Sequence, residues 1–339
     1  MITPTKGHDF SVIILSIESE PSLREGGWSI ISIIITNSPL EFSGTGENTD
    51  MSLDFTNFDD APAEFSKLVY DVPYIEQNFE DGGTMWMTRY GWAWRDHLTP
   101  EKWYHEKQYV NHGTRLTRGT GAVYRVSTEG SDGRVLDIVV KFSRFAQDVP
   151  LHITVTYPGN IPSHLVDNSR FNSPFYEFGQ TKAIRMPSEN GTPRIMTGRP
   201  LAIYSPPNRY KLWQLGRTQH RFNHYARLLA KDQESVPESQ RLKLDMLRQY
   251  IVLFSWEKGE DAELAFLAGK LTGDQLFEMT EDVQKLLEQK GFYVLDNKPR
   301  HFIVRTRKNG DLLKKDGKIA YSLIDFELLI PIPDQSPFS

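Results

Sequence analysis

The alternation of apolar and polar residues predicts most of the strands of this chain. Residues 11–17 and 28–36 are short apolar runs rich in β-branched side chains, as is typical of buried strands. Farther along, residues 122–126 and 135–142 flank the turn sequence Glu-Gly-Ser-Asp-Gly, which predicts a β-hairpin. The same criteria predict strands over residues 153–157, 199–204, 250–256, 302–305 and 319–324. From residue 114 onward the pattern therefore indicates a β-meander followed by mixed helices and strands.

Apolar residues spaced three and four apart predict the helices. One helix is expected over residues 174–185, with Pro174 in its first turn and Ser173 as its N-cap. Residues 208–248 predict two helices divided near Pro237. Two further helices are expected over residues 261–271 and 280–289.

One segment is unusually aromatic, because four of the seven tryptophans lie between residues 85 and 103. These four are Trp86, Trp92, Trp94 and Trp103. Tryptophan buries more surface than other side chains, so we interpret the segment as hydrophobic packing between the N-terminal residues and those that follow. A surface on which a ligand stacks is the alternative.

The composition narrows the possible classes of protein. With 339 residues, 39% hydrophobic and 24% charged, the chain suits a globular protein of two domains, or of one domain with large additions. The net charge of −5 argues against a protein that mainly coats nucleic acid. A chain without cysteine has no disulfides, thiolate zinc sites or cysteine nucleophiles. Both N-terminal apolar runs are too short to cross a bilayer and lack the flanks of a secretory signal, so we expect a cytoplasmic protein without a membrane partner.

Two local features favour phosphate binding. Gly119-Thr120-Gly121 precedes the first strand of the hairpin, and glycines there let backbone N–H groups approach phosphate oxygens. Lys141 follows three apolar β-branched residues in the second strand, where its ammonium could hold an anion. Each feature also has a structural explanation, since the glycines could form an ordinary turn and the lysine could extend to solvent.

Two aspartates at the ends of apolar strands are the next candidates. Asp296 follows Val294 and Leu295, and Asp325 follows the apolar run that ends the chain's last predicted strand. The strands beside them are expected to pair as a hairpin across the loop 307–318. Two neighbouring carboxylates suit Mg²⁺, which prefers oxygen ligands and keeps waters and phosphate contacts. Both aspartates could instead form turns.

Taken in order over residues 112–330, these features resemble the protein-kinase-like superfamily. Its signature runs from a glycine-rich loop and a strand lysine to a helix glutamate, a hinge, a catalytic aspartate and a metal-binding aspartate. Gly119 and Gly121 match the first two loop glycines, and Lys141 matches the strand lysine. Asp296 begins the catalytic-loop pattern Asp-x-Lys-Pro, and Asp325 begins the metal-binding Asp-Phe pair. The ending Ile-Asp-Phe-Glu is more similar to small-molecule kinases of the choline and aminoglycoside kinase type than to typical protein kinases.

The resemblance implies a nucleotide partner and roles for four more residues. Glu177 would be the helix glutamate that pairs with the strand lysine. The strand 250–256 would be the hinge, with backbone groups near Ser255 and Glu257 bonding the adenine edge. Asp261, at the start of the next helix, would bond a ribose hydroxyl.

The cofactors implied by the resemblance are ATP and Mg²⁺. Lys141 would hold the α- and β-phosphates, Asp325 would bind the metal, and Asp296 would orient the acceptor hydroxyl and accept its proton. This scheme requires the side chains of Lys141 and Asp325 to converge on one site.

The departures from the family pattern matter equally. Leu295 replaces the histidine before the catalytic aspartate, Glu327 replaces the glycine of the metal-binding motif, and Tyr124 stands at the third loop glycine. His301 occupies the place of a metal-binding asparagine, and imidazole suits softer metals than Mg²⁺. His301 would therefore mean that the second metal site is lost, contact phosphate as an imidazolium, mark a degraded site, or simply be a packed or surface histidine. Few residues follow Glu327, so we expect a reduced C-lobe or a fragment of a longer protein.

These observations predict an α+β protein with a kinase-like two-lobe fold, in which an antiparallel N-lobe sheet is followed by a reduced helical C-lobe. The expected parts are a β-rich N-terminal segment over 1–106, an N-lobe over 107–258 with a helical insertion over 208–248, and the C-lobe over 259–339. The predicted function is ATP- and Mg²⁺-dependent phosphotransfer to an unspecified small-molecule or protein acceptor. The alternative is a pseudokinase that binds nucleotide and acts as a scaffold or regulator.

One basic stretch has no place in this scheme. Residues 208–231 carry six Lys and Arg side chains and no acidic one, and His220 and His224 lie four residues apart within it. Three interpretations are open: the stretch could be a solvated cationic face, it could bind an anionic substrate or partner, or it could bind nucleic acid. The two histidines could also share a metal ion.

Overall fold

The computed structural model describes residues 55–116, 121–149, 161–167, 169–187, 191–333 and 335. Contacts divide the chain into Met1–Glu47 and Asn48–Ser339, and all of the described residues belong to the second unit. The strands predicted over 11–17, 28–36 and 153–157 lie outside the described residues, as does Gly119.

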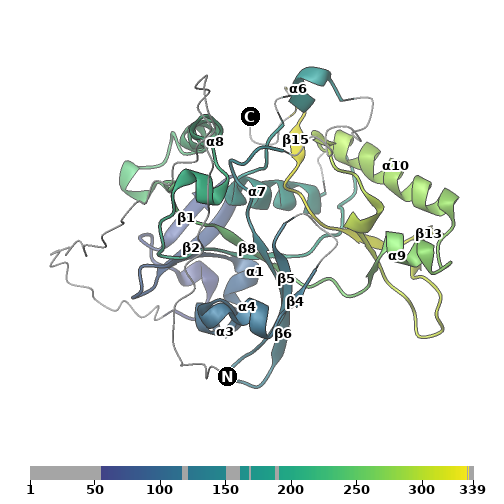
Figure 1. Cartoon of the computed structure of the whole chain (residues 1–339), viewed down its shortest axis with the longest axis horizontal. Coiled ribbons are helices and arrows are strands. Elements are labelled where there is room, and N and C mark those ends of the chain that lie inside the picture. Colours follow the sequence, from purple (N-terminus) through teal and green to yellow (C-terminus); the bar gives the residue numbers. More distant parts are fainter. Residues whose placement is uncertain are drawn as a thin grey trace, which may run out of the picture. The chain divides into compact units, whose positions relative to one another are not determined.

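An antiparallel sheet of eight strands organises this unit (Figure 1). Its order is β1-β2-β3-β7-β8-β6-β5-β4. The strands are β1 (Ser66–Val69), β2 (Val72–Asn78), β3 (Thr84–Thr88), β4 (Thr114–Arg115), β5 (Val123–Glu129), β6 (Val135–Phe142), β7 (Pro200–Ser205) and β8 (Ile251–Ser255). The predicted hairpin is confirmed by the pairing of β5 with β6, in which Glu129 faces Val135. The predicted boundary at residue 106 falls inside this sheet, because β1–β3 and β4–β8 are hydrogen-bonded into one structure.

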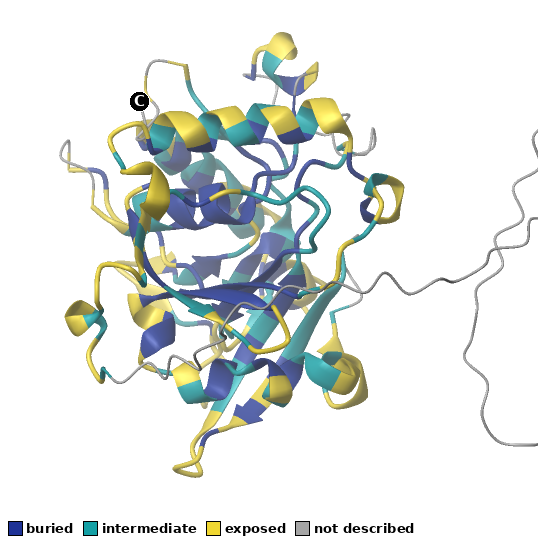
Figure 2. Cartoon of the chain, turned by 90° about the vertical axis from the view of Figure 1, so that its left-hand side faces the viewer, coloured by how far each residue is buried: buried dark blue, intermediate teal, exposed yellow. Residues whose placement is uncertain are grey.

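Alternating residues of the central strands bury both faces of the sheet. On one face, Val252 and Phe254 of β8 pack with Phe175 and Phe178 of helix α7 (Pro174–Arg185). On the other face, Ile251 and Leu253 belong to a second core that includes residues of the short helices. These helices are α1 (Arg89–Trp92), α2 (Arg95–Leu98), α3 (Pro100–Trp103) and α4 (Gln108–Asn111). Figure 2 shows the strands largely buried between these layers, whereas the surface helices keep an exposed side.

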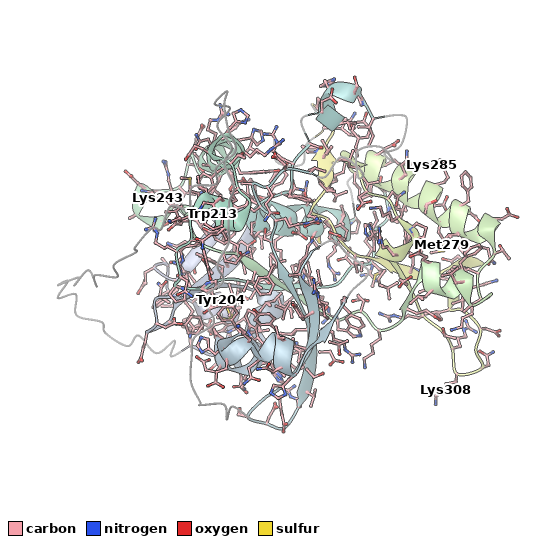
Figure 3. All side chains as sticks on the ribbon, viewed as in Figure 1. Tyr204, Trp213, Lys243, Met279, Lys285 and Lys308 are labelled. Atoms are coloured by element: carbon pink, nitrogen blue, oxygen red, sulfur yellow. The ribbon has the colours of Figure 1, made fainter. Side chains whose placement is uncertain are left out.

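The aromatic segment packs in the core, as its composition predicts. Trp86 lies in the α7-side core, and Trp92 and Trp103 lie in the core of the opposite face. The Trp103 ring meets the ring of buried Tyr204 edge to face, with centroids 5.5 Å apart, whereas Trp213 lies exposed on the surface (Figure 3). Burial of three of the four tryptophans supports the packing interpretation over a stacking surface for a ligand.

Two helices are expected within residues 208–248, and the prediction of the second one is wrong. Helix α8 (Gln219–Asp232) forms, between the 3₁₀ turns η3 (Leu212–Leu215) and η4 (Glu238–Gln240), but residues 241–250 contain no helix. The Leu242 N–H donates to the Gln233 side chain at 2.7 Å, and the Asp245 N–H donates to the Tyr250 hydroxyl at 2.8 Å. Side-chain acceptors thus satisfy the backbone of an irregular segment that still buries Leu242 and Tyr250.

The remainder of the unit combines two helices with several short strands. Helix α9 spans Ala262–Leu267, and helix α10 spans Gly273–Gln289, beginning earlier than predicted because Thr272 and Gln275 form a capping box. Met279 lies on the buried side of α10 and Lys285 on its exposed side (Figure 3). The remaining elements are η1 (Phe58–Asp60), η2 (His105–Lys107), α6 (Ser163–Asp167), β9 (Glu260–Asp261), β10 (Phe292–Val294), η5 (Pro299–His301), β11 (Phe302–Val304), β12 (Lys314–Lys315), β13 (Lys318–Ile319), β14 (Tyr321–Leu323) and β15 (Leu329–Pro331).

The hairpin predicted near the C-terminus is confirmed, since β11 pairs antiparallel with β14. Strand β10 pairs antiparallel with β15. Asp296 lies just beyond β10, and Asp325 lies just beyond β14. In the part of the chain that the structure describes, no helix has both the length and the apolar character needed to span a bilayer.

Candidate functional site

Lys141 lies near the end of β6, in the middle of the sheet. Its backbone pairs with Val123 of β5 on one side and with Val252 of β8 on the other. Side chains alternate along a strand, so Lys141 points to the same face as Val139, toward α7, while Val140 points to the opposite core. Only 8% of Lys141 is exposed, so its ammonium needs buried partners.

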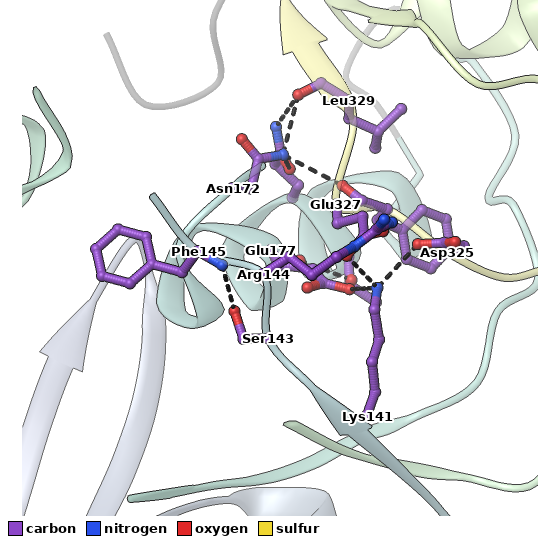
Figure 4. A network of polar contacts seen from close by, with 12 residues as sticks. Lys141, Ser143, Arg144, Phe145, Asn172, Glu177, Asp325, Glu327 and Leu329 are labelled. Carbon is purple, nitrogen blue, oxygen red and sulfur yellow. Dashed lines mark hydrogen bonds and ion pairs between the residues drawn. The ribbon is translucent and has the colours of Figure 1, made fainter. Parts of the chain in front are cut away.

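Three carboxylates surround the Lys141 ammonium (Figure 4). Its Nζ atom lies 3.0 Å from Glu177 Oε1, 2.8 Å from Asp325 Oδ1 and 3.4 Å from Glu327 Oε2. Burial alone would lower the pKa of Lys141, but these three carboxylates together raise that pKa above its ordinary value. The convergence of Lys141 and Asp325, which the sequence interpretation requires, is therefore present in the structure.

Helix α7 places Glu177 beneath the sheet. The helix begins where predicted because the Ser173 hydroxyl accepts from the Tyr176 N–H at 3.3 Å and Pro174 occupies the first turn. Glu177 follows one turn later and is 1% exposed. Burial raises the pKa of Glu177 to about 7, although the neighbouring Lys141 acts to lower that pKa.

Asp325 reaches the cluster from the turn after β14. Its backbone has a φ of +69°, a left-handed conformation that aspartate tolerates better than most residues. His301 fixes this turn, since the Ile324 N–H donates to the His301 carbonyl at 2.9 Å and His301 Nε2 lies 3.8 Å from Asp325 Oδ2. Burial opposes ionisation of Asp325, but Lys141 and then His301 lower its pKa below the ordinary value.

Arg144 and Glu327 also belong to the cluster and were not recognised from the sequence. The Arg144 guanidinium forms an ion pair with Glu327 and lies over the Phe171 ring, 3.9 Å from its centroid. Glu327 thus bridges two cations, Lys141 and Arg144. The only sequence signal for this pair is its position relative to the motifs. Arg144 follows the strand lysine by three residues, and Glu327 follows the aspartate of the Asp-Phe pair by two.

Asn172 ties the segment that carries Glu327 to the start of α7. Its backbone N–H donates to the Glu327 carbonyl at 2.9 Å, and its side-chain amide donates to the Phe326 and Leu329 carbonyls. The side-chain oxygen of Asn172 accepts from the Tyr225 hydroxyl at 3.1 Å. This buried network holds the two carboxylate-bearing segments in fixed register around Lys141.

Asp296 lies after β10 and connects to the same site through His301. His301 Nδ1 lies 2.9 Å from the Asp296 carbonyl, and its other ring nitrogen faces Asp325. Lys298 Nζ lies 2.6 Å from Asp296 Oδ1, so the first and third residues of the Asp-x-Lys-Pro pattern form an ion pair. Leu295, which replaces the expected histidine, is fully buried in a separate small core.

The proposed adenine and ribose residues all have partners within the protein. The Ser255 N–H donates to the Arg199 carbonyl at 2.9 Å, so that donor is engaged in the sheet. The Glu257 carboxylate accepts from Arg305 and from the Ser322 hydroxyl, each at 2.9 Å. Asp261 is the N-cap of α9, where its carboxylate accepts from the Leu264 N–H. These contacts give the three residues structural roles beside those that the resemblance assigns.

The donor set for a metal is small. Among the described residues, no group of three or more His, Asp or Glu side chains is arranged to hold a metal ion. Asp325 and His301 face each other, and the Asp325 side chain is 31% exposed, more than any other member of the cluster. Mg²⁺ often takes only one or two protein carboxylates and completes its shell with water and phosphate oxygens, so the residues fit a metal that arrives with a phosphate ligand.

The basic stretch 208–231 is partly structural. Arg217 is buried and donates to the Phe145, Met246 and Arg248 carbonyls. Burial, followed by the charges of Arg170 and Arg227, lowers the pKa of His224 to about 4. His224 is therefore neutral at pH 7, and among the described residues no metal-ligating group of three or more side chains includes it and His220.

Comparison of the sequence with models of known protein families found no match, and comparison with curated proteins found no match either.

Proposed function

We propose that this chain is an ATP- and Mg²⁺-dependent phosphotransferase of an atypical kinase-like type, acting on a small-molecule or protein hydroxyl. One observation carries the proposal: the Lys141 ammonium is held between Glu177 of α7 and Asp325 beyond β14. These partners lie 36 and 184 residues away along the chain. The kinase-like signature requires this lysine, this helix glutamate and this metal-binding aspartate to meet.

The arrangement of the elements supports the two-lobe part of the proposal. Strands β4, β5, β6, β8 and β7 are five adjacent antiparallel strands, as expected of a kinase-like N-lobe. The glycine loop joins the first two of them, the lysine lies on the third, and α7 follows in the chain before β7. Helices α9 and α10, together with strands β10 and β14 that precede Asp296 and Asp325, would form the reduced C-lobe.

The chain's own residues would position and neutralise charge. When bound, ATP supplies the phosphoryl group, and Mg²⁺ supplies charge neutralisation for it. Lys141 would bind phosphate oxygens, with Glu177 orienting its ammonium, and Asp325 would hold the metal. Asp296 would orient the acceptor hydroxyl and accept its proton, while Lys298, 2.6 Å away, stabilises its carboxylate.

A pseudokinase is the second candidate, and a specific feature favours it. His301 stands where a second metal ligand is expected, and it bridges Asp296 and Asp325 through contacts within the protein. A chain with this arrangement could bind nucleotide and act as a scaffold or regulator without turnover.

A thermal-shift titration with ATP, with and without Mg²⁺, tests the proposal, followed by an assay of ATP turnover. For the enzyme, we expect stabilisation that increases with Mg²⁺, together with measurable turnover. Stabilisation without turnover would favour the pseudokinase. A chain whose melting temperature does not respond to ATP at millimolar concentration with or without the metal would refute both.

Two variants separate the proposed roles. Asp325→Asn should abolish the Mg²⁺-dependent part of the ATP stabilisation, because it removes the metal-binding carboxylate. Asp296→Asn should leave ATP binding intact and lower kcat by about 10²- to 10⁴-fold, the usual contribution of a general base. Asp311→Asn, in an exposed loop, is the matched control and should change neither quantity.

A further inference from the structure

The Lys141 ammonium has no spare donor in this structure. An ammonium group has three N–H donors, and the three carboxylates around Lys141 match them in number. A phosphate that binds Lys141 must therefore displace one carboxylate. Glu327 makes the longest of the three contacts, at 3.4 Å, and it also pairs with the permanently charged guanidinium of Arg144.

Arg144 lies where a phosphate chain would continue from Lys141. The two cations share the Glu327 carboxylate, so they are separated by about the width of one anionic group. Arg144 also lies close to Gly121, since a Cβ built on Gly121 would lie 3.9 Å from the Arg144 Nε atom. The Arg144 guanidinium lies over the Phe171 ring, 3.9 Å from its centroid. Figure 4 shows the Arg144 side chain extending toward Glu327.

We propose that Arg144 is a second phosphate-binding cation, and that Glu327 is an internal anion that occupies the position between Arg144 and Lys141 until a polyphosphate displaces it. A carboxylate between two cations has the charge and the geometry that a phosphate group needs there, because guanidinium binds both anions through paired N–H donors. That the bound polyphosphate belongs to a nucleotide rests on the proposed function. The existence of a polyphosphate site is inferred from the two cations alone.

Binding of inorganic tripolyphosphate without metal tests the site directly. We expect Arg144→Gln to weaken this binding by about 10- to 100-fold, as for the loss of hydrogen bonds to a charged group, whereas Arg144→Lys should retain part of it. Glu327→Gln should bind tripolyphosphate more tightly than the wild type, because the competing internal charge is gone. Arg134→Gln is the matched control, since Arg134 lies exposed in the β5–β6 turn and pairs with Asp132.

Removing Arg144 leaves Glu327 buried with one cation fewer, so the single variant could fold poorly. The double variant Arg144→Gln/Glu327→Gln removes one positive and one negative charge, so the net charge of the cluster is unchanged. It should bind tripolyphosphate more weakly than Glu327→Gln alone. Equal affinities for these two variants, or wild-type affinity in Arg144→Gln, would overturn the proposal.

The outcomes also distinguish this inference from the proposed function. Tripolyphosphate binding that depends on Arg144, without any added affinity for ATP or adenosine, would support the polyphosphate site and refute the nucleotide-dependent enzyme. ATP binding that is unchanged in Arg144→Gln would refute the inference and leave the proposed function standing.

Discussion

Replacing Lys141 by methionine should destabilise the protein strongly, because it leaves buried carboxylates without their cation. Glu177 is 1% exposed and Glu327 is 4% exposed, so water cannot replace the lost partner. Breaking a buried ion pair by removing one member typically costs about 3–5 kcal/mol. We therefore expect the free energy of unfolding of Lys141→Met to fall by about that amount at pH 7.5.

A double-mutant cycle separates the charge effect from the loss of packing. Glu177→Gln alone should not destabilise the protein at pH 7.5, because Lys141 keeps two carboxylates and the cost of burying the Glu177 charge disappears. In Lys141→Met/Glu177→Gln, the most deeply buried carboxylate is gone, so the double variant should be more stable than Lys141→Met. The coupling energy should reach about 2 kcal/mol, within the range for residues in one network.

Urea unfolding followed by far-UV circular dichroism measures these differences, provided that the m-values agree. Lys270→Met is the matched control, because Lys270 forms a 2.6 Å ion pair with Glu260 but both side chains are at least one-quarter exposed. Exposed pairs contribute about 0–1 kcal/mol, so the control should lose no more than that. A Lys141→Met variant as stable as Lys270→Met, or a double variant whose loss equals the sum of the single losses, would refute the assignment of Lys141 as the buried counter-charge.

Two further predictions follow from single positions. The folded pKa of Glu177 is about 7 and its unfolded pKa is about 4.3, so protonated Glu177 stabilises the fold at low pH. Up to about 4 kcal/mol of this stability is lost as the pH rises from about 4 through 7. Glu177→Gln should therefore flatten the pH dependence of the urea midpoint between pH 5 and 8, and an unchanged slope would contradict burial of Glu177 as the cause. Gly259 has a φ of +149°, and a Cβ there would lie 2.3 Å from the Val304 carbonyl oxygen. Gly259→Ala should therefore lower the free energy of unfolding in urea by about 2–4 kcal/mol. Gly310→Ala is the control, because Gly310 has a φ of +90° but open space around it, and it should lose only about 1 kcal/mol. Equal losses for the two variants would show that the structure relieves the clash at Gly259.

Elements with strong local signals were predictable from the sequence. The helix over 174–185 and the strand over 135–142 have the predicted bounds, because a proline after an N-capping serine and a Gly-rich turn each act over a few residues. Lys141 and Asp325 could be paired because both match one ordered motif set. Each of these predictions needed only neighbouring residues or a known order of motifs.

Features that depend on contacts between residues distant in the sequence were not predictable in the same way. The periodicity of residues 242–250 suits a helix, but the Gln233 side chain, from the end of α8, captures the Leu242 backbone instead. Helix α10 begins earlier than the sequence pattern suggests, with Thr272 as its N-cap, and its apolar residues Met279, Val283 and Leu287 pack in one core with Phe292 and Phe302. The Arg144–Glu327 pair joins residues 183 apart, and no periodicity or spacing connects them.

The charge balance of the buried cluster links the proposed activity to its need for a metal. Three carboxylates, Glu177, Asp325 and Glu327, face two cations, Lys141 and Arg144, so the ionised cluster carries an excess negative charge. A bare polyphosphate would meet this excess and would have to separate Glu327 from its partners. A polyphosphate carrying a divalent cation brings the missing positive charge to Asp325, the most exposed of the three carboxylates. On this argument, the metal increases polyphosphate affinity chiefly by offsetting Asp325, so neutralising that residue alone should make binding less dependent on the metal.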